Sequence, residues 1–174
     1  SDGKYNLTND FGGTLYEYIG KKQAMELMHY VDAINVSHGG AQTRLYSTAN
    51  SEFKTKCLQC GLHLLDASVR HLGTDINFVV LKNLFDELEP KVDFQFRTPV
   101  RQILATDGGY EIVTDGGSHT CKQCIVSVGR SGSKWMETVC RELGIETKSN
   151  RVDIGVRVEL QAEIFKHLTD ALYE

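Results

Sequence analysis

The segment "RHLGTD" gathers residue types that do chemistry in enzymes. Histidine changes protonation near neutral pH, so its His71 is a candidate to move a proton at a substrate. Arg70, Thr74 and Asp75 are candidates to face that substrate, because loops carry binding residues more often than the elements they connect. The structural alternative is that Asp75 caps a helix over 77–89 and pairs with Arg70. The two interpretations are compatible.

A second candidate is the glycine-bearing turn in "VSVGRSGSKW". We predict a buried strand over 125–128, then the turn Gly129-Arg130-Ser131-Gly132, then a helix. The glycines admit close approach of a ligand, and the first N–H groups of a helix suit a phosphate or another polar ligand edge. The turn is not a GxGxxG dinucleotide fingerprint. The structural alternative is a tight connector in which one of the serines caps the helix.

The five cysteines include two pairs with CxxC spacing, Cys57/Cys60 and Cys121/Cys124, a pattern that can hold zinc. We predict no metal site. The first pair falls in a helical stretch without a neighbouring glycine knuckle. The second pair falls in a predicted strand, where residues three apart point to opposite faces. We interpret these thiols as structural.

The first half of the chain mixes helical and extended patterns. Helical periodicity breaks at Gly20, and the strand–helix–strand order that follows predicts a βαβ unit with parallel strands. We interpret Asp32 as solvated charge. The predicted elements are a loop at 1–13, helices within 14–36, a strand at 43–47, a helix at 51–62, a strand at 63–71 and a helix at 77–89.

The second half contains a predicted meander. Asp-Gly dipeptides at 107–109 and 115–117 lie between alternating polar and apolar runs, which is a strong hairpin signal. The predicted elements are strands at 92–106, 109–115 and 119–129, a helix at 133–144, a strand at 152–160 and a helix at 161–172.

The composition excludes several classes of protein. Hydrophobic residues make up 41% and charged residues 24%, as in ordinary globular domains. A net charge of −4 gives no electrostatic reason to expect a nucleic-acid partner. No apolar run reaches the length of a membrane span and no signal-peptide pattern occurs, so we expect no membrane partner and a cytoplasmic location.

Four segments, "DGKYNLTNDFGG", "VRHLGTD", "VGRSGSKW" and "VDIGVRVE", resemble a family of FAD-dependent dehydrogenases of unassigned substrate. These are flavoproteins of the glutathione-reductase type. The resemblance keeps the order of the segments and covers most of the chain. It implies an FAD-binding domain whose last strand runs under the flavin, with "VSVGRSGS" in the place of that family's Ala-Thr-Gly-like motif.

The resemblance also implies a site. It brings the loop at 2–13 near the flavin ring, where a lysine would stabilise the reduced, anionic flavin, and it puts "RHLGTD" on the face toward an unknown small-molecule substrate. The implied contacts of FAD are Lys4, Asn6, Gly129, Arg130, Ser131 and Gly132.

Members of that family begin with strand–GxGxxG–helix, and this chain contains no GxGxxG. We therefore expect the 174 residues to be an internal piece of an FAD-dependent oxidoreductase, inactive alone and unable to retain FAD. Its partners would be the remainder of its own chain and other copies, paired through an exposed sheet edge.

The predicted fold class is α/β (mixed α+β) in two lobes. A cap lobe at 1–75, with a ferredoxin-like plait as one option, is completed by a return strand and helix at 150–174. The residues at 76–149 form the C-terminal part of the FAD-binding domain. The alternative function is a non-enzymatic α/β interaction or regulatory module, in which "VGRSGS" is only a turn.

Overall fold

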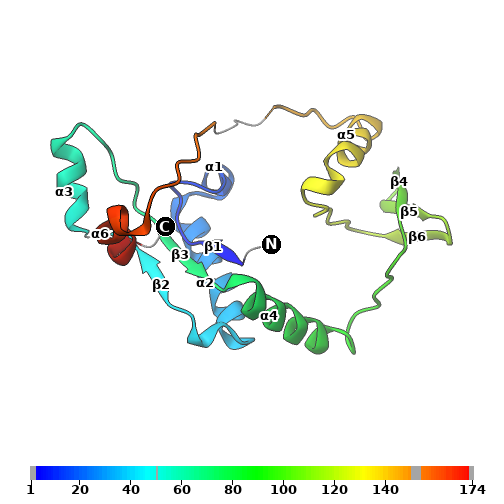
Figure 1. Cartoon of the computed structure of the whole chain (residues 1–174). Helices are drawn as coiled ribbons and strands as arrows, with labels where there is room; N and C mark the ends of the chain where they lie inside the picture. Colours follow the sequence, from blue (N-terminus) through cyan, green and yellow to red (C-terminus); the bar gives the residue numbers. More distant parts are fainter. Residues whose placement is uncertain (1–2, 50, 150–153, 173–174) are drawn as a thin grey trace. The chain divides into compact units, whose positions relative to one another are not determined.

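The computed structural model describes residues 3–49, 51–149 and 154–172. They form helices and two small antiparallel sheets, which confirms the predicted mixed α/β class (Figure 1). The chain divides into two compact units. Unit 1 contains the described residues up to Asp93 and from Val158 onward, and unit 2 those from Phe94 to Arg157. This division differs from the predicted bounds, because the helix that follows residue 72 belongs to unit 1.

The sheet of unit 1 has three short strands in the order β1-β3-β2. They are β1 (Lys4–Asn6), β2 (Leu45–Ser47) and β3 (Ser68–His71). Both neighbours run antiparallel to β3, so the predicted parallel βαβ unit is wrong. The described strand and helix order is also not that of a ferredoxin-like plait.

The antiparallel pairing of β2 with β3 has a local cause at the end of the helix between them, α3 (Glu52–Gln59). Gly61 has a φ of +71°, and the Leu62 N–H donates to the Cys57 carbonyl at 2.8 Å. This glycine C-cap turns the chain back on itself. The returning segment then meets Thr48, whose backbone N–H donates to Ala67 O at 2.9 Å.

The helices of unit 1 largely follow the predicted pattern. The break at Gly20 is confirmed, since it separates α1 (Leu15–Ile19) from α2 (Lys21–Ser37). Helix α4 (Gly73–Leu88) begins four residues before the predicted start, so Asp75 lies inside its first turn and is not its N-cap. The predicted strand at 152–160 is wrong over 154–160, which has no regular structure, while 152–153 lie outside the described residues. Helix α6 (Ala162–Leu172) is confirmed.

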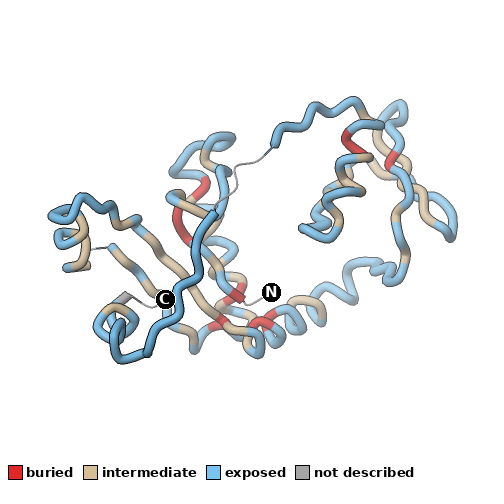
Figure 2. The backbone as a smooth tube through the Cα atoms, turned by 45° about the horizontal axis from the view of Figure 1, so that its top comes forward, coloured by how far each residue is buried: buried red, intermediate tan, exposed pale blue. Residues whose placement is uncertain are grey.

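Unit 1 has a small core. Its buried apolar side chains are Leu7, Ala24, Leu72 and Val80. Buried polar side chains add to it, as when the Tyr5 hydroxyl donates to Asn77 Oδ1 at 2.7 Å. Figure 2 shows how few of the described positions are buried. Polar bonds therefore contribute to the cohesion of this unit beside the apolar core.

Unit 2 contains the predicted meander of β4 (Val100–Thr106), β5 (Gly109–Thr114) and β6 (Gly117–Cys121). The pairs Thr106↔Gly109 and Thr114↔Gly117 close two-residue turns, which confirms both Asp-Gly hairpins. Strand β4 begins eight residues later than predicted.

Helix α5 (Ser133–Glu142) follows the meander, and its predicted end at Gly144 is confirmed by a φ of +69° there. Ile103 of β4 and Val139 of α5 are buried and line the same pocket, so helix and sheet face each other.

Within residues 3–49, 51–149 and 154–172, no helix has the combined length and apolar character that crossing a bilayer needs.

Candidate functional site

The predicted site residues fall into two groups, one in each unit. Lys4, Asn6 and the segment from Arg70 to Asp75 belong to unit 1. The turn from Gly129 to Gly132 belongs to unit 2. Each group is described by itself.

In unit 1, the pairing of β1 with β3 brings three of the predicted residues together. Lys4 lies directly opposite His71, and Asn6 lies opposite Val69. Residues opposite each other on paired strands project from the same face, so Lys4 and His71 are cross-strand neighbours. Thr74 and Asp75 follow within the first turn of α4, and both are exposed.

Arg70 projects from the other face of β3 and is held by the fold. Its Nε and Nη2 donate to the two carboxylate oxygens of Asp32 at 2.5 and 2.9 Å, and its Nη1 donates to the Thr43 carbonyl at 2.7 Å. The predicted pair with Asp75 is therefore wrong. Arg70 connects β3 to α2 and to the segment before β2, with its side chain 11% exposed.

Asp32 is the residue of this group that the sequence interpretation missed. It is not solvated charge, since its side chain is only 13% exposed. A signal was present in the sequence. Asp32 and Asn35 share a helical stripe with Met28, at steps of four and three residues, so polar side chains stand on a predominantly apolar face. A charge on such a stripe indicates a buried partner.

A pocket of about 210 Å³ lies between β1 and the helices α1 and α2. Asn6 and Asp32 line it, together with apolar side chains of both helices. Asn6 is therefore a predicted flavin contact that lines a pocket of unit 1.

In unit 2, the turn before α5 has the conformation that its glycines allow. Gly129 has φ 64° and ψ −164°, a region that almost only glycine occupies. Arg130–Gly132 form a single 3₁₀ turn that leads into α5. The N-cap position of α5 is Gly132 and no side chain caps the helix, so the predicted serine cap is wrong.

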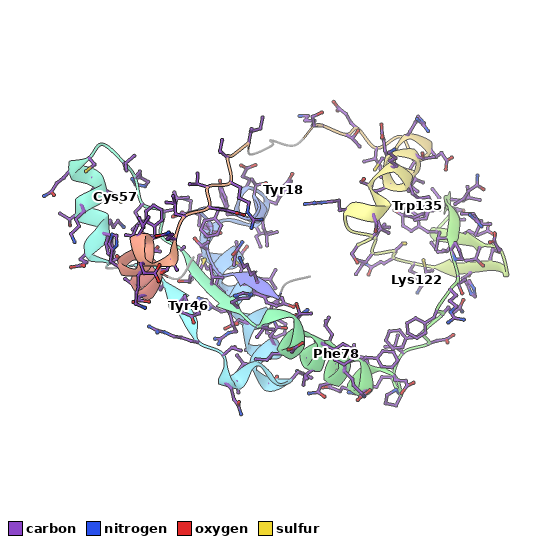
Figure 3. All side chains as sticks on the ribbon, in the orientation of Figure 1. Tyr18, Tyr46, Cys57, Phe78, Lys122 and Trp135 are labelled. Atoms are coloured by element: carbon purple, nitrogen blue, oxygen red, sulfur yellow. The ribbon has the colours of Figure 1, made fainter. Side chains whose placement is uncertain are left out.

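The strand predicted at 125–128 is also wrong. Residues 123–128 have no regular structure, and Ile125 is 93% exposed. The ladder with β5 ends at Cys121, and the chain bends at Lys122 (Figure 3). The apolar residues of this segment predicted a buried strand. No described strand pairs with the segment, and Ile125 and Val128 are exposed.

The same bend changes the geometry of the second CxxC pair. Cys121 is the last residue of β6, and Cys124 lies beyond the bend, so the pair does not lie within one strand as predicted. Burial raises the pKa of the Cys124 thiol above its ordinary value, and the nearby Cys121 adds to this effect. All five cysteines are unbridged.

Among the described residues, no three His, Cys, Asp or Glu side chains gather in a way that could hold a metal ion. The prediction about the CxxC pairs therefore stays a prediction.

A pocket of about 490 Å³ lies where the turn of unit 2 meets α5. Its lining includes Gly129, Ser133, Glu137, Thr147 and Lys148. The structure thus places the first residue of the predicted turn at a cavity, with hydroxyl and ammonium groups nearby.

Scans of the chain against protein-family models, curated proteins and solved structures find no match. The function is therefore argued from the residues and from the two pockets.

Proposed function

We propose that this chain is part of an FAD-dependent oxidoreductase, and that the turn from Gly129 to Gly132 contacts the cofactor. The observation that carries the proposal is the pocket of about 490 Å³ beside Gly129. Its volume falls in the range of roughly 300–1,000 Å³ that is usual for small-molecule sites. Val128, Gly129 and Ser133 of its lining belong to one of the four segments that resemble the flavoprotein family.

The groups around this pocket suit the polar part of a flavin nucleotide. A Cβ on Gly129 would meet no atom within 4 Å, so the backbone of the turn is open to a ligand. Ser127, Ser133 and Lys148 supply hydroxyl and ammonium donors, which favour a phosphate or a carbonyl edge. Glu137 also lines the pocket and would favour a donor on the ligand. Bound flavin accepts a hydride or electrons from a substrate.

In unit 1, the family resemblance alone assigns Lys4 and Asn6 to polar contacts with a flavin, with Lys4 stabilising its reduced form. His71 moves a proton at the substrate, which is a small molecule, while Thr74 and Asp75 face that substrate. Arg70 orders β3 through Asp32, and so positions His71 beside it on the strand.

The 174 residues contain no GxGxxG sequence. We therefore propose that another segment of polypeptide binds the pyrophosphate of FAD. That segment is the partner that this chain requires. Five unbridged cysteines suit a reducing compartment, and we place the enzyme in the cytoplasm.

The test is flavin binding by the product of the complete coding sequence. We expect the purified product to show flavin absorbance. Gly129→Val should raise the Kd for FAD at least tenfold, because a branched side chain fills the opening beside the turn. Gly144→Val is the matched control. Gly144 flanks α5 at its other end, also has positive φ and an open Cβ position, and does not line the pocket.

Both glycine variants should lose similar stability from backbone strain, roughly 1–3 kcal/mol each. Only Gly129→Val should lose FAD affinity. Equal losses of affinity in the two variants, or a product without flavin absorbance, would overturn the proposal.

The alternative is an α/β interaction module, and one observation favours it. Helix α4 exposes Phe78, Leu81 and Leu88, and Phe78 is 67% exposed (Figure 3). Large apolar side chains on one exposed helix face are typical of protein-binding surfaces. A product that lacks flavin but self-associates in sedimentation, and becomes monomeric after Phe78→Ser, would support the module instead.

A further inference from the structure

The pocket between β1, α1 and α2 is lined mainly by apolar side chains. Tyr5 of β1 lines it, and so do four side chains of the two helices, Leu15, Leu27, Met28 and Val31. Its volume is about 210 Å³. An apolar cavity of about 150 Å³ is sufficient to bind benzene, so this pocket has room for one ring with a substituent.

One polar side chain at this pocket lacks a partner. Asn35 is 5% exposed and lines the pocket, and its Nδ2 makes no hydrogen bond. A buried amide donor without an acceptor is unfavourable, and a ligand that supplies the acceptor when the Asn35 side chain turns toward the pocket removes that penalty. The other buried polar atoms without a partner among the described residues, on Asn9 and Trp135, do not line this pocket.

The charge on the pocket wall is already neutralised. Asp32 is the charged residue in the lining, and both of its carboxylate oxygens accept hydrogen bonds from Arg70. A charged ligand would therefore find no counter-ion and would lose its hydration shell. This arrangement selects for neutral ligands.

We propose that this pocket binds a neutral carboxamide with a body of about one ring, and that Asn35 is the residue that recognises the amide. A carboxamide offers both an acceptor and donors, so it pairs with the Asn35 amide whichever way that side chain is turned. Tyr5 and Met28 contact the ring, since thioether sulfur is favourable beside an aromatic edge. The proposal does not depend on flavin binding.

The probe is benzamide, titrated into the ¹⁵N-labelled chain and followed by amide chemical shifts of the pocket residues. We expect saturable shifts with a Kd in the millimolar range, as suits so small a ligand. Benzoate has the same shape with a negative charge and should bind at least tenfold more weakly. Toluene lacks the amide and should bind, but more weakly than benzamide.

The variant Asn35→Leu should weaken benzamide at least fivefold and leave toluene unchanged or tighter. Gln59→Leu, at an exposed amide on α3, is the matched control and should change neither. Benzoate binding as tightly as benzamide, or benzamide binding that Asn35→Leu does not affect, would overturn the proposal.

A second variant covers the case in which Asn35→Leu does not fold. Leu27 is 45% exposed, so Leu27→Trp can fill the pocket from its open side without disturbing the buried core. It should abolish the binding of both benzamide and toluene. Benzamide shifts that persist in Leu27→Trp would place the ligand elsewhere and contradict the assignment.

Discussion

Unit 1 and unit 2 each contain an arginine that forks onto an aspartate, and the two pairs differ in burial. In unit 1, the side chains of Arg70 and Asp32 are 11% and 13% exposed. In unit 2, those of Arg101 and Asp115 are 59% and 60% exposed, although the bonds are as short, at 2.7 and 2.6 Å. An exposed partner that is left alone is solvated by water, whereas a buried one is not. Geometry alone therefore does not tell which pair stabilises the fold.

The same contrast extends to the rest of each unit. Side-chain hydrogen bonds in unit 1 join segments that are far apart in sequence, as from Tyr5 to Asn77 and from Thr8 to the Asp66 carbonyl. Unit 2 is built around a meander whose strands follow each other through two-residue turns. Unit 1 depends on specific long-range polar contacts, and unit 2 on local pairing with one packed helix.

The largest expected effect is that of Arg70→Ala. It leaves the Asp32 carboxylate largely buried and unpaired and removes the bond to the Thr43 carbonyl, which should cost about 3 kcal/mol. Urea unfolding followed by helical circular dichroism measures this, since the longest described helices, α2 and α4, belong to unit 1. Arg70→Lys keeps the charge without the fork and should lose less. An unchanged unfolding midpoint in Arg70→Ala would show that this pair does not hold unit 1 together.

The second largest loss of stability is expected from a substitution in the core of unit 2. Ile103 is 4% exposed and lines a pocket of about 250 Å³ together with Val139, so part of its surroundings is already open. Ile103→Ala should therefore cost about 2 kcal/mol, at the lower end for such truncations. The fluorescence of Trp135, the single tryptophan, reports on unit 2. Leu104→Ala, next to it on β4 and 40% exposed, is the control and should cost less than about 1 kcal/mol.

The contrast between the units also explains what the sequence could predict. The hairpins depend on Asp-Gly turns and neighbouring strands, which are local signals, and they are confirmed. The end of α5 at Gly144 and the break at Gly20 are local glycine signals of the same kind. The pairing of β2 and β3 depended on how the chain returned after α3, and the βαβ prediction assumed the wrong direction.

The candidate site shows the same limit. Asp75 was the acid predicted to pair with Arg70, but the partner is Asp32, on a helix 38 residues earlier. The strand expected at 125–128 was inferred from composition, and burial of an apolar run depends on a neighbouring strand that composition does not specify. The turn at Gly129 was located correctly, because a positive φ at a glycine is a local property.

A smaller effect should depend on pH. His38 at the end of α2 bonds Glu87 of α4 at 2.8 Å, and this bond raises the pKa of His38 above its ordinary value of 6.5, with help from the Ile34 carbonyl. The stabilisation by protonated His38 is therefore complete below the ordinary pKa and is lost as the pH rises through the raised pKa. The same bond lowers the pKa of Glu87, so the contribution of the carboxylate is lost as the pH falls through that lowered pKa.

The pair should thus be strongest between these two limits. We expect the Tm difference between the natural chain and His38→Gln to be larger at about pH 6 than at about pH 8.5. Glu87→Gln removes the same charge pair and also the bond from Lys91 at 3.0 Å, so it should show the same dependence on top of a further loss. A difference that stays constant with pH would mean that only the neutral hydrogen bond matters.

The smallest expected effect is that of Arg101→Ala, which completes the comparison of the two arginine–aspartate pairs. The bond to Arg101 lowers the pKa of Asp115, so whatever the pair contributes is lost as the pH falls through that lowered pKa. Both side chains are mostly in water, where an ion pair gains little and salt screens it. The midpoint shift, read from Trp135 fluorescence, should be roughly a third or less of the shift that Arg70→Ala causes in unit 1, and it should vanish at about 1 M salt. The pair joins β4 to the turn after β5, but the ladder already fixes that register through the backbone, so little else depends on it. If Arg101→Ala shifted the midpoint as far as Arg70→Ala does, burial would not be what separates the two units, and the network around Arg70 would have no special role in unit 1.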